Sequence, residues 1–236
     1  MIEQERTLEG LGFLGERLDA SGLPYRRHKT WENGFDDLRA RDFAGIIPMG
    51  GNAHAWQEEH HPFLREERLL LAEAVEAGVA VLGICLSAQL LARSLGAEVR
   101  SGGSEIGWLE IAPTEAAADD PLFSGLTAPT GVYQWHYDTF ELPAGARLLA
   151  SSPLCENQAF RVDGAPVWGI QFHPEVEPDI WEVWIGRHPN EVRESGVDVD
   201  ALRTSVRSGA DASRPFRAGL FDSFFELARE SSSSKA

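Results

Sequence analysis

The chain has 236 residues, of which 43% are hydrophobic and 25% are charged, as in ordinary folded globular proteins. Its 37 acidic and 21 basic residues give a formal net charge of −16, which disfavours non-specific binding to nucleic acid or to an anionic membrane. No apolar run approaches the roughly 18–20 residues that cross a bilayer, and the N-terminus has no basic-then-apolar secretion signal.

The first part of the chain alternates between helical and strand patterns. Leucines recur at helical spacing from Leu8 to Leu18 and predict a first helix. Residues 23–29 and 43–49 are strand candidates, and the apolar spacing over 62–77 predicts a second helix. The uninterrupted apolar run 79–84 predicts a strand that is buried on both faces. This alternation indicates an α/β fold with a parallel sheet.

The second part of the chain is typical of an antiparallel sheet. Short apolar runs separated by Gly, Pro and Asp predict strands at 106–111, 132–142, 148–150, 158–162 and 167–172. Helices are predicted at 178–185, 202–208 and 217–229, and the polar residues 231–236 are predicted to form a disordered tail. We therefore expect a single domain over residues 1–230, with a mostly parallel central sheet flanked by helices in three layers and an antiparallel extension.

Cys85 directly follows the buried strand, and a segment with helical spacing begins at Leu86. A sharp strand-to-helix turn exposes its residue at the carboxyl end of the sheet, as in the nucleophile elbow of serine hydrolases. The free N–H groups and the positive dipole end of the helix would favour the thiolate, which is the nucleophilic form of cysteine. The alternative is a buried cysteine that packs as a small hydrophobe.

His173 and Glu175 end the last predicted strand and lie two residues apart, so both side chains point the same way in an extended segment. A carboxylate that orients an imidazole stabilises its charged form, and the imidazole can exchange protons with a thiol and a leaving amine. If the strands at 79–84 and 167–172 are neighbours, Cys85 and His173 meet at the carboxyl edge of the sheet. The alternative is a structural histidine at a strand end.

Gly50 and Gly51 follow the strand candidate at 43–49. Paired glycines let backbone N–H groups approach a ligand closely. Gly51 and Leu86 could therefore supply the two donors of an oxyanion hole beside the cysteine. A plain loop is the alternative.

Other polar residues are also candidates for a site. His136 and Asp138 could line a polar pocket, or they could simply pair on a hairpin. The cluster His54, His60 and His61 fits no ordered ligand spacing, so we expect a solvated loop there and no metal. The second cysteine, Cys155, has no basic neighbour in sequence and is expected to be structural. Two cysteines make no disulfide framework, so a cytoplasmic location is expected.

Five segments in chain order resemble those of class I, triad-type glutamine amidotransferases: Gly50-Gly51, 83–89 (GICLSAQ), 135–143, 151–161 and 171–175 (QFHPE). The likeness is greatest to stand-alone proteins related to the glutaminase domain of GMP synthase. The resemblance implies a flavodoxin-like α/β fold, hydrolysis of the glutamine side-chain amide and no cofactor. It also implies a possible synthetase partner chain that receives the ammonia.

The resemblance implies a role for each matching residue. Cys85 would attack the amide and form a γ-glutamyl thioester, while His173 would act as base and then acid, oriented by Glu175. Gly51 and Leu86 would supply the oxyanion N–H groups. The substrate would be held by Gly50, Gln89, His136, Tyr137 and Asp138.

Three features depart from the family pattern. Ser87 and Tyr137 stand where the elbow and the pocket loop of the family usually have glycine, so the packing of the turn and the shape of the pocket are expected to differ. The family also begins with an apolar strand. Here only Met1 and Ile2 precede a polar run, so we expect a truncated or misassigned start, or a sheet that lacks this strand.

Two other functions use the same residues. A γ-glutamyl peptidase or hydrolase would apply the triad to γ-glutamyl amides or peptides, and it would need no ammonia acceptor. A non-catalytic regulatory subunit would keep the fold, but it would have no need of Cys85, His173 and Glu175 together.

Overall fold

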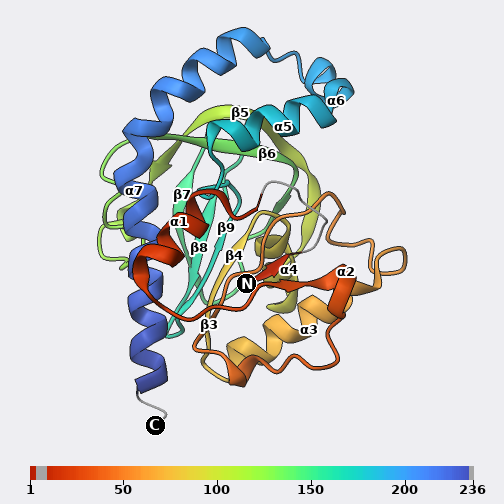
Figure 1. Cartoon of the computed structure of the whole chain (residues 1–236), viewed down its shortest axis with the longest axis vertical. Coiled ribbons are helices and arrows are strands. Elements are labelled where there is room, and N and C mark those ends of the chain that lie inside the picture. The colour runs from red at the N-terminus through yellow and green to blue at the C-terminus, as the bar shows by residue number, and fades with distance from the viewer. Residues whose placement is uncertain (4–9, 234–236) are drawn as a thin grey trace.

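The computed structural model describes residues 1–3 and 10–233 of the chain (Figure 1). Its central sheet has seven strands in the order β3-β4-β9-β8-β7-β5-β6. Three strands are parallel: β3 (Gly45–Ile46), β4 (Ala80–Ile84) and β9 (Val167–Ile170). The others pair antiparallel: β8 (Ala159–Val162), β7 (Ala146–Ser151), β5 (Val99–Pro113) and β6 (Thr130–Phe140). The predicted α/β class and antiparallel extension are confirmed, but the sheet is mixed rather than mostly parallel.

A first strand is present, but it forms a separate two-stranded sheet and meets the chain beyond β3 only through an isolated bridge. β1 (Ile2–Glu3) pairs in parallel with β2 (His28–Lys29), and Ile2 forms a parallel bridge to Pro48. The Ile2 N–H donates to the Ile47 carbonyl at 3.1 Å, and the Met49 N–H donates to the Ile2 carbonyl at 3.0 Å. The strand is short, and Ile2 is its apolar contribution to the core. Pro48 lies beyond β3, where its missing N–H interrupts no ladder.

Helices cover both faces of the sheet, and the alternation of side chains on β4 shows how. Leu82 and Ile84 pack with α1 (Gly12–Ser21) and α7 (Val199–Ser233). Val81 points to the other face and packs with α3 (Pro62–Glu76) and α4 (Leu86–Ser94). These three layers were predicted from the alternating helical and apolar segments. Leu8, at the start of the predicted first helix, lies outside the described residues.

A smaller layer packs on the β5–β6 hairpin. It consists of α5 (Pro178–Arg187), α6 (Pro189–Glu194) and the first half of α7, around an aromatic cluster that includes Tyr133, Trp135 and Trp181. Figure 1 shows α5 and α6 in the upper part of the molecule, near β5 and β6, and α7 running down the left side. The predicted helices 202–208 and 217–229 are one helix, because buried residues on both sides of Pro215 pack it against the core. This helix reaches Ser233, past the start of the predicted tail, and 234–236 lie outside the described residues.

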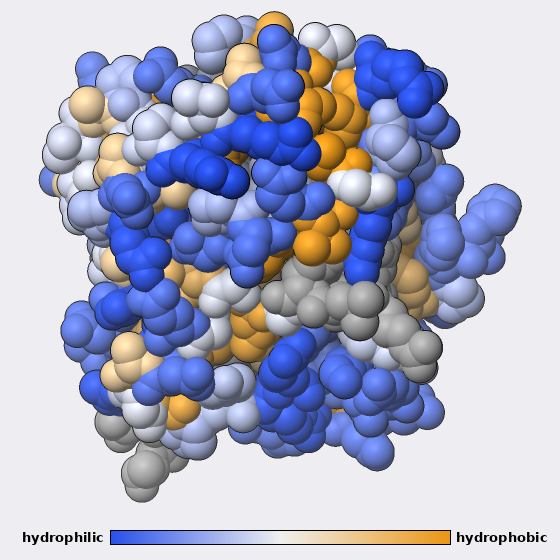
Figure 2. Space-filling model, turned by 45° about the horizontal axis from the view of Figure 1, so that its top comes forward, coloured by the Kyte–Doolittle hydropathy of each residue, from blue (hydrophilic) through white to orange (hydrophobic). Residues whose placement is uncertain are grey.

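Short elements complete the described chain. The strand predicted at 23–29 is reduced to β2, and the following loop contains α2 (Thr30–Asn33). Two 3-10 turns lie at Ala40–Asp42 and Glu115–Ala117. Hydrophilic side chains cover much of the face in Figure 2, and a band of apolar side chains interrupts them in its upper part. Within the described residues, no helix combines the length and the apolarity that a membrane crossing requires.

Candidate active site

Cys85 occupies a strained turn between β4 and α4. Its backbone angles are φ 52° and ψ −111°, and among the described non-glycine residues it alone has positive φ. Such strain costs on the order of 1–3 kcal/mol and persists only where the surroundings enforce it. The Cys85 N–H donates to the Ile170 carbonyl of β9 at 2.7 Å, and a Cβ on Gly83 would lie 3.0 Å from the Ser87 carbonyl. Strand and helix thus approach so closely that the side chain of Cys85 is held at the N-terminus of α4.

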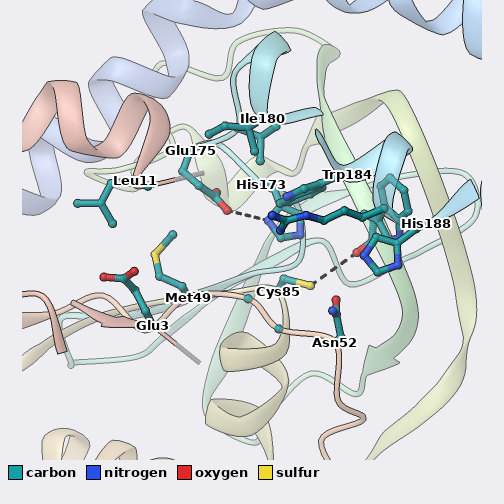
Figure 3. Close-up of a pocket in the computed structure, with 16 residues that line it drawn as sticks. Glu3, Leu11, Met49, Asn52, Cys85, His173, Glu175, Ile180, Trp184 and His188 are labelled. Atoms are coloured by element: carbon teal, nitrogen blue, oxygen red, sulfur yellow. Dashed lines mark hydrogen bonds and ion pairs between the residues drawn. The ribbon is translucent and has the colours of Figure 1, made fainter. Parts of the chain in front are cut away.

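The parallel pairing of β4 and β9 brings His173 to Cys85. Both side chains line the same cavity, and His173 Nδ1 lies 2.8 Å from Glu175 Oε1 (Figure 3). The His173 N–H donates to the Tyr133 carbonyl at 2.9 Å, which fixes the backbone beneath the imidazole. The structure therefore places Cys85, His173 and Glu175 together at the carboxyl edge of the sheet, where the sequence pattern predicted them to meet.

Opposite charges perturb the pKa of His173. Burial acts to lower the pKa of the imidazole, but negative charge on Glu175 and on Cys85 outweighs burial and raises this pKa to about 10. The imidazole therefore carries a proton at neutral pH. The sulfur of Cys85 accepts a hydrogen bond from Gln171 Nε2 at 3.6 Å, whereas its contact to the Trp135 carbonyl is long, at 3.8 Å.

Arg217 of α7 fixes the backbone on both sides of Glu175. Its side chain is fully buried, and Nη1 donates to the carbonyls of Pro174 at 3.2 Å and Val176 at 3.0 Å. Of the two carboxylate oxygens of Glu175, Oε1 contacts His173, and Oε2 has no hydrogen-bond partner among the described residues. The hydrogen bonds of Arg217 thus fix the backbone of Glu175, and one carboxylate oxygen contacts Nδ1 of His173.

Gly50 and Gly51 lie beside the thiol. The Ile84 N–H donates to the Pro48 carbonyl at 3.0 Å, which holds this loop against β4. A Cβ on Gly50 would lie 3.3 Å from Cys85 Cβ and 3.0 Å from His173 Cε1, so this position needs glycine for close approach. Leu86 opens α4, so its N–H has no acceptor within the helix. Both predicted oxyanion donors are therefore adjacent to Cys85 in space or in sequence.

Two cavities meet at Cys85. The first, of about 120 Å³, lies on the His173 side and has an apolar wall that includes Met49 and Trp184. The second, of about 850 Å³, extends past Leu86, and no lysine or arginine is among the described residues that line it. Four predicted substrate-binding residues line the second cavity, namely Gln89, His136, Tyr137 and Asp138. Gly50 lines the smaller one instead.

A chain of amides connects the larger cavity to the thiol. Gln89 Nε2 donates to the Asp138 carbonyl at 3.3 Å and to Gln171 Oε1 at 3.2 Å. Gln171 in turn donates to the Cys85 sulfur. Asp138 Oδ2 lies 2.6 Å from His54 Nδ1, and its buried Oδ1 has no hydrogen-bond partner among the described residues. That oxygen is available to a donor from a ligand.

Tyr137 lies at the rim of the larger cavity and reaches towards α6. Its hydroxyl donates to Glu191 Oε2 at 2.5 Å, and His188 Nδ1 contacts Glu191 Oε1 at 2.8 Å. Burial and the bond to Glu191 raise the pKa of Tyr137 above its usual value. Burial acts to raise the pKa of Glu191, but hydrogen bonds from Tyr137 and His188 prevail and lower it. The phenol therefore links the hairpin to α6 across the cavity mouth.

Several residues at the site were missed in the sequence. Gln171 lies in a segment used to recognise the family, but only the pairing of β4 with β9 shows that it contacts Cys85. Trp184 packs edge-on against His173, with ring centres 5.0 Å apart. Glu191 belongs to a helix that was not predicted, and no sequence signal links it to Tyr137.

One group of described residues, Glu105, His136 and Cys155, has potential metal-ligand atoms within 4.8 Å of one another. Protein contacts already engage them. His136 Nε2 lies 3.3 Å from Glu105 Oε2, which also accepts from Gln158 Nε2 at 2.5 Å. The Cys155 sulfur lies 3.3 Å from Thr139 Oγ1. One nitrogen of His136 is therefore held by Glu105, so the imidazole does not face the cavity freely.

Comparisons with known proteins identify the family of the chain. The model of the family described as Glutamine amidotransferase class-I matches residues 26–182, which is more than half of the chain. The chain is 34% identical over 146 residues to a glutamine-hydrolyzing GMP synthase subunit of Pyrococcus abyssi, covering 60% of this chain and 71% of that protein. It is also 34% identical over 160 residues to the putative glutamine amidotransferase-like protein YfeJ of Salmonella typhimurium, covering 66% of each.

Solved structures share the fold over nearly the whole chain. A glutamine amidotransferase from Thermotoga maritima superposes with a TM-score of 0.83 at 29% identity, covering 96% of this chain and 95% of that one. One from Methylobacillus flagellatus gives a TM-score of 0.85 at 27% identity, covering 96% and 94%. The resemblance inferred from five short segments is confirmed. The chain belongs to the class-I glutamine amidotransferase family.

Proposed function

We propose that the chain hydrolyses the side-chain amide of glutamine, with Cys85 as nucleophile, His173 as proton donor and Glu175 as the carboxylate that orients it. The observation that carries this proposal is a cysteine on a strained turn beside an imidazole that is protonated at neutral pH. Membership of the family, with relatives named as glutamine-hydrolyzing, supports the choice of substrate.

The reaction would begin from a Cys85 thiolate and a His173 imidazolium. The thiolate adds to the amide carbon, and the N–H groups of Gly51 and Leu86 donate to the oxyanion, where one such donor is typically worth about 10²–10³ in kcat. His173 gives its proton to the amide nitrogen, ammonia leaves, and a γ-glutamyl thioester remains. His173, now neutral, takes a proton from water, which attacks the thioester and releases glutamate. Because His173 already holds its proton, no initial transfer from the thiol is needed.

The larger cavity would hold the amino-acid end of the substrate. The unpartnered Oδ1 of Asp138 suits the α-ammonium group, and Gln89, His136 and Tyr137 line the same space. Gly50 would let the substrate approach Cys85. Ammonia would pass to a partner synthetase chain in the cytoplasm, as the relatives named as GMP synthase subunits suggest, and no cofactor takes part.

A second candidate is the hydrolysis of γ-glutamyl amides or peptides by the same residues. The cavity of about 850 Å³ favours it, because this volume suits ligands much larger than glutamine. A regulatory subunit without activity is the third candidate. It would not explain why Cys85 is kept in a strained backbone conformation.

One experiment separates the three candidates. The protein is incubated with glutamine or with a γ-glutamyl peptide, and intact and peptide masses are measured together with ammonia and glutamate release. We expect a γ-glutamyl adduct on the peptide that contains Cys85, a higher kcat/KM for glutamine, and no adduct in Cys85→Ser. A higher kcat/KM for the γ-glutamyl peptide would select the second candidate. Folded protein without adduct or turnover would select the third.

A further inference from the structure

A buried polar pair lies beneath the elbow. Ser87 follows Cys85 by two residues, at the position where the family usually has glycine, and Glu67 lies on α3. Both residues are 0% exposed. Ser87 Oγ lies 2.6 Å from the carbonyl oxygen of Met49 and 2.5 Å from Glu67 Oε1. Three oxygen atoms from three different segments are thus joined by two short contacts.

The two contacts require two protons. A serine hydroxyl carries one proton, and the backbone carbonyl of Met49 can only accept a hydrogen bond. If Ser87 donates to Met49, the contact with Glu67 needs a proton on the carboxyl group. If Ser87 donates to Glu67 instead, two oxygen lone pairs face each other at the Met49 carbonyl, which leaves a buried acceptor unsatisfied. A neutral Glu67 satisfies both contacts at once.

We propose that Glu67 is a protonated carboxylic acid at neutral pH, that it donates to Ser87, and that Ser87 donates to the Met49 carbonyl. This relay connects α3, the first turn of α4 and the loop that follows β3. The Met49 carbonyl belongs to the peptide unit that precedes Gly50, and the Met49 N–H is already bonded to the Ile2 carbonyl. Both polar groups of Met49 are therefore held, and the loop leaves Met49 in a fixed direction.

The relay gives Glu67 and Ser87 a role in the reaction, and this step rests on the proposed function. Gly51 and Leu86 would donate to the same oxyanion, but they belong to separate segments. Ser87 lies next to Leu86 and binds the loop that carries Gly51, so the relay sets the separation of the two donors. Glu67 and Ser87 are thus positioning residues, because neither touches the reacting atoms. The hydroxyl of Ser87, at the position where the family usually has glycine, therefore connects the first turn of α4 to the loop after β3 and to α3.

Infrared spectroscopy tests the protonation state without reference to activity. A difference spectrum at pH 7 between the wild type and Glu67→Gln is expected to show the C=O stretch of a protonated carboxylic acid, shifted to lower frequency in D₂O. Glu66→Gln, which changes an exposed neighbour on the same helix, is the matched control and is expected to show only carboxylate bands. Carboxylate bands alone in the Glu67→Gln difference spectrum would overturn the proposal.

Kinetics test the positioning role, with rates normalised to the Cys85 sites that a glutamine-directed electrophile labels. Ser87→Ala is expected to lower kcat about 10- to 100-fold with KM changed less than about two-fold, because a misplaced donor weakens only the transition state. Glu67→Leu is expected to lower kcat similarly. Glu67→Gln retains an N–H donor for Ser87 and is expected to stay within about three-fold of the wild type.

Two outcomes contradict parts of this account in different ways. If Ser87→Ala and Glu67→Leu lower only the melting temperature, while kcat per labelled site is unchanged, the positioning role is refuted. If the wild type releases no ammonia or amine from any substrate, the proposed function is refuted, and the infrared band still decides the state of Glu67.

Discussion

The molecule contains two groups that each combine a cysteine, a histidine and a glutamate. At the elbow, Cys85 has positive φ and begins a helix, and negative charge around His173 raises the pKa of its imidazole to about 10. On the hairpin side, Cys155 lies between β7 and β8 beside His136 and Glu105. There, burial raises the pKa of the Cys155 thiol above its usual range. The same residue types therefore sit in opposite electrostatic settings.

The difference shows that the same residue types create different settings for a cysteine, depending on the backbone that carries them and on the contacts they make. Cys85 lies at the N-terminus of α4, beside an imidazole whose pKa is raised to about 10. At Cys155, no helix begins, and His136 is held by Glu105 and by the Asp138 carbonyl, 3.1 Å from Nδ1. We expect a thiol in that setting to pack and hydrogen bond rather than to attack a substrate.

The largest expected effect compares the two cysteines directly. Cys85→Ser is expected to lower kcat on glutamine by at least about 10³-fold, because it removes the nucleophile. Cys155→Ser is expected to stay within about three-fold of the wild type. Ammonia release measured on both purified variants checks this, and the comparison fails if Cys155→Ser is the more damaging change.

The two histidines give the next contrast. His173→Gln is expected to lower kcat about 10²- to 10⁴-fold, because the leaving nitrogen loses its proton donor. His136→Gln is expected to raise KM more than it lowers kcat, since His136 lines the larger cavity, where we propose that the substrate binds. Steady-state kinetics on glutamine separate the two patterns. Equal losses of kcat would contradict the distinction.

A smaller effect concerns pH. In the proposed reaction, a protonated His173 gives its proton to the leaving nitrogen, so kcat is expected to fall as pH rises through about 10. Glu175→Gln removes a charge that raises this pKa, so the alkaline limb is expected to move to lower pH, with kcat at neutral pH about 10-fold lower. The matched variant Glu105→Gln is expected to leave the limb in place. A pH profile of kcat for the wild type and both variants gives the pH at which activity falls in each. If this pH is the same in Glu175→Gln as in the wild type, the fall reports the titration of a group other than His173.

The smallest effect concerns Tyr137, on the hairpin strand that also carries His136. Tyr137→Gly restores the residue usual in the family and removes the link to Glu191. We expect a change in KM of about two- to five-fold and a loss of less than about 1 kcal/mol in the free energy of unfolding, because the bond is partly exposed. Tyr137→Phe keeps the ring and removes only the hydroxyl, so KM values for glutamine and a γ-glutamyl peptide separate the two contributions.

The sequence predicts the elbow well because each signal there is local. The apolar run of β4, the helical spacing after Cys85 and the two-residue offset of His173 and Glu175 each place a side chain on a known edge of the sheet. The substrate cavity is only partly predictable. Its lining residues lie in recognisable segments, but the partner of Tyr137 lies 54 residues away on α6.

Some elements cannot be predicted from sequence patterns, because long-range contacts rather than local spacing define them. β1 is only two residues long, too short for an alternating pattern, and it is defined by its bonds to Ile47 and Met49. Pro215 predicts a break between two helices, yet packing on both sides preserves one helix. The pairing of Ser87 with Glu67 depends on how α3 lies against α4, which no local signal in either segment specifies.

Arg217 links the docking of α7 to the backbone that positions Glu175. Its guanidinium, on α7, donates hydrogen bonds to the two backbone carbonyls that flank Glu175. A growing polypeptide on the ribosome has Cys85, His173 and Glu175 long before it has this anchor. Under the proposed function, we expect such a nascent chain to hydrolyse no glutamine until α7 has emerged and docked.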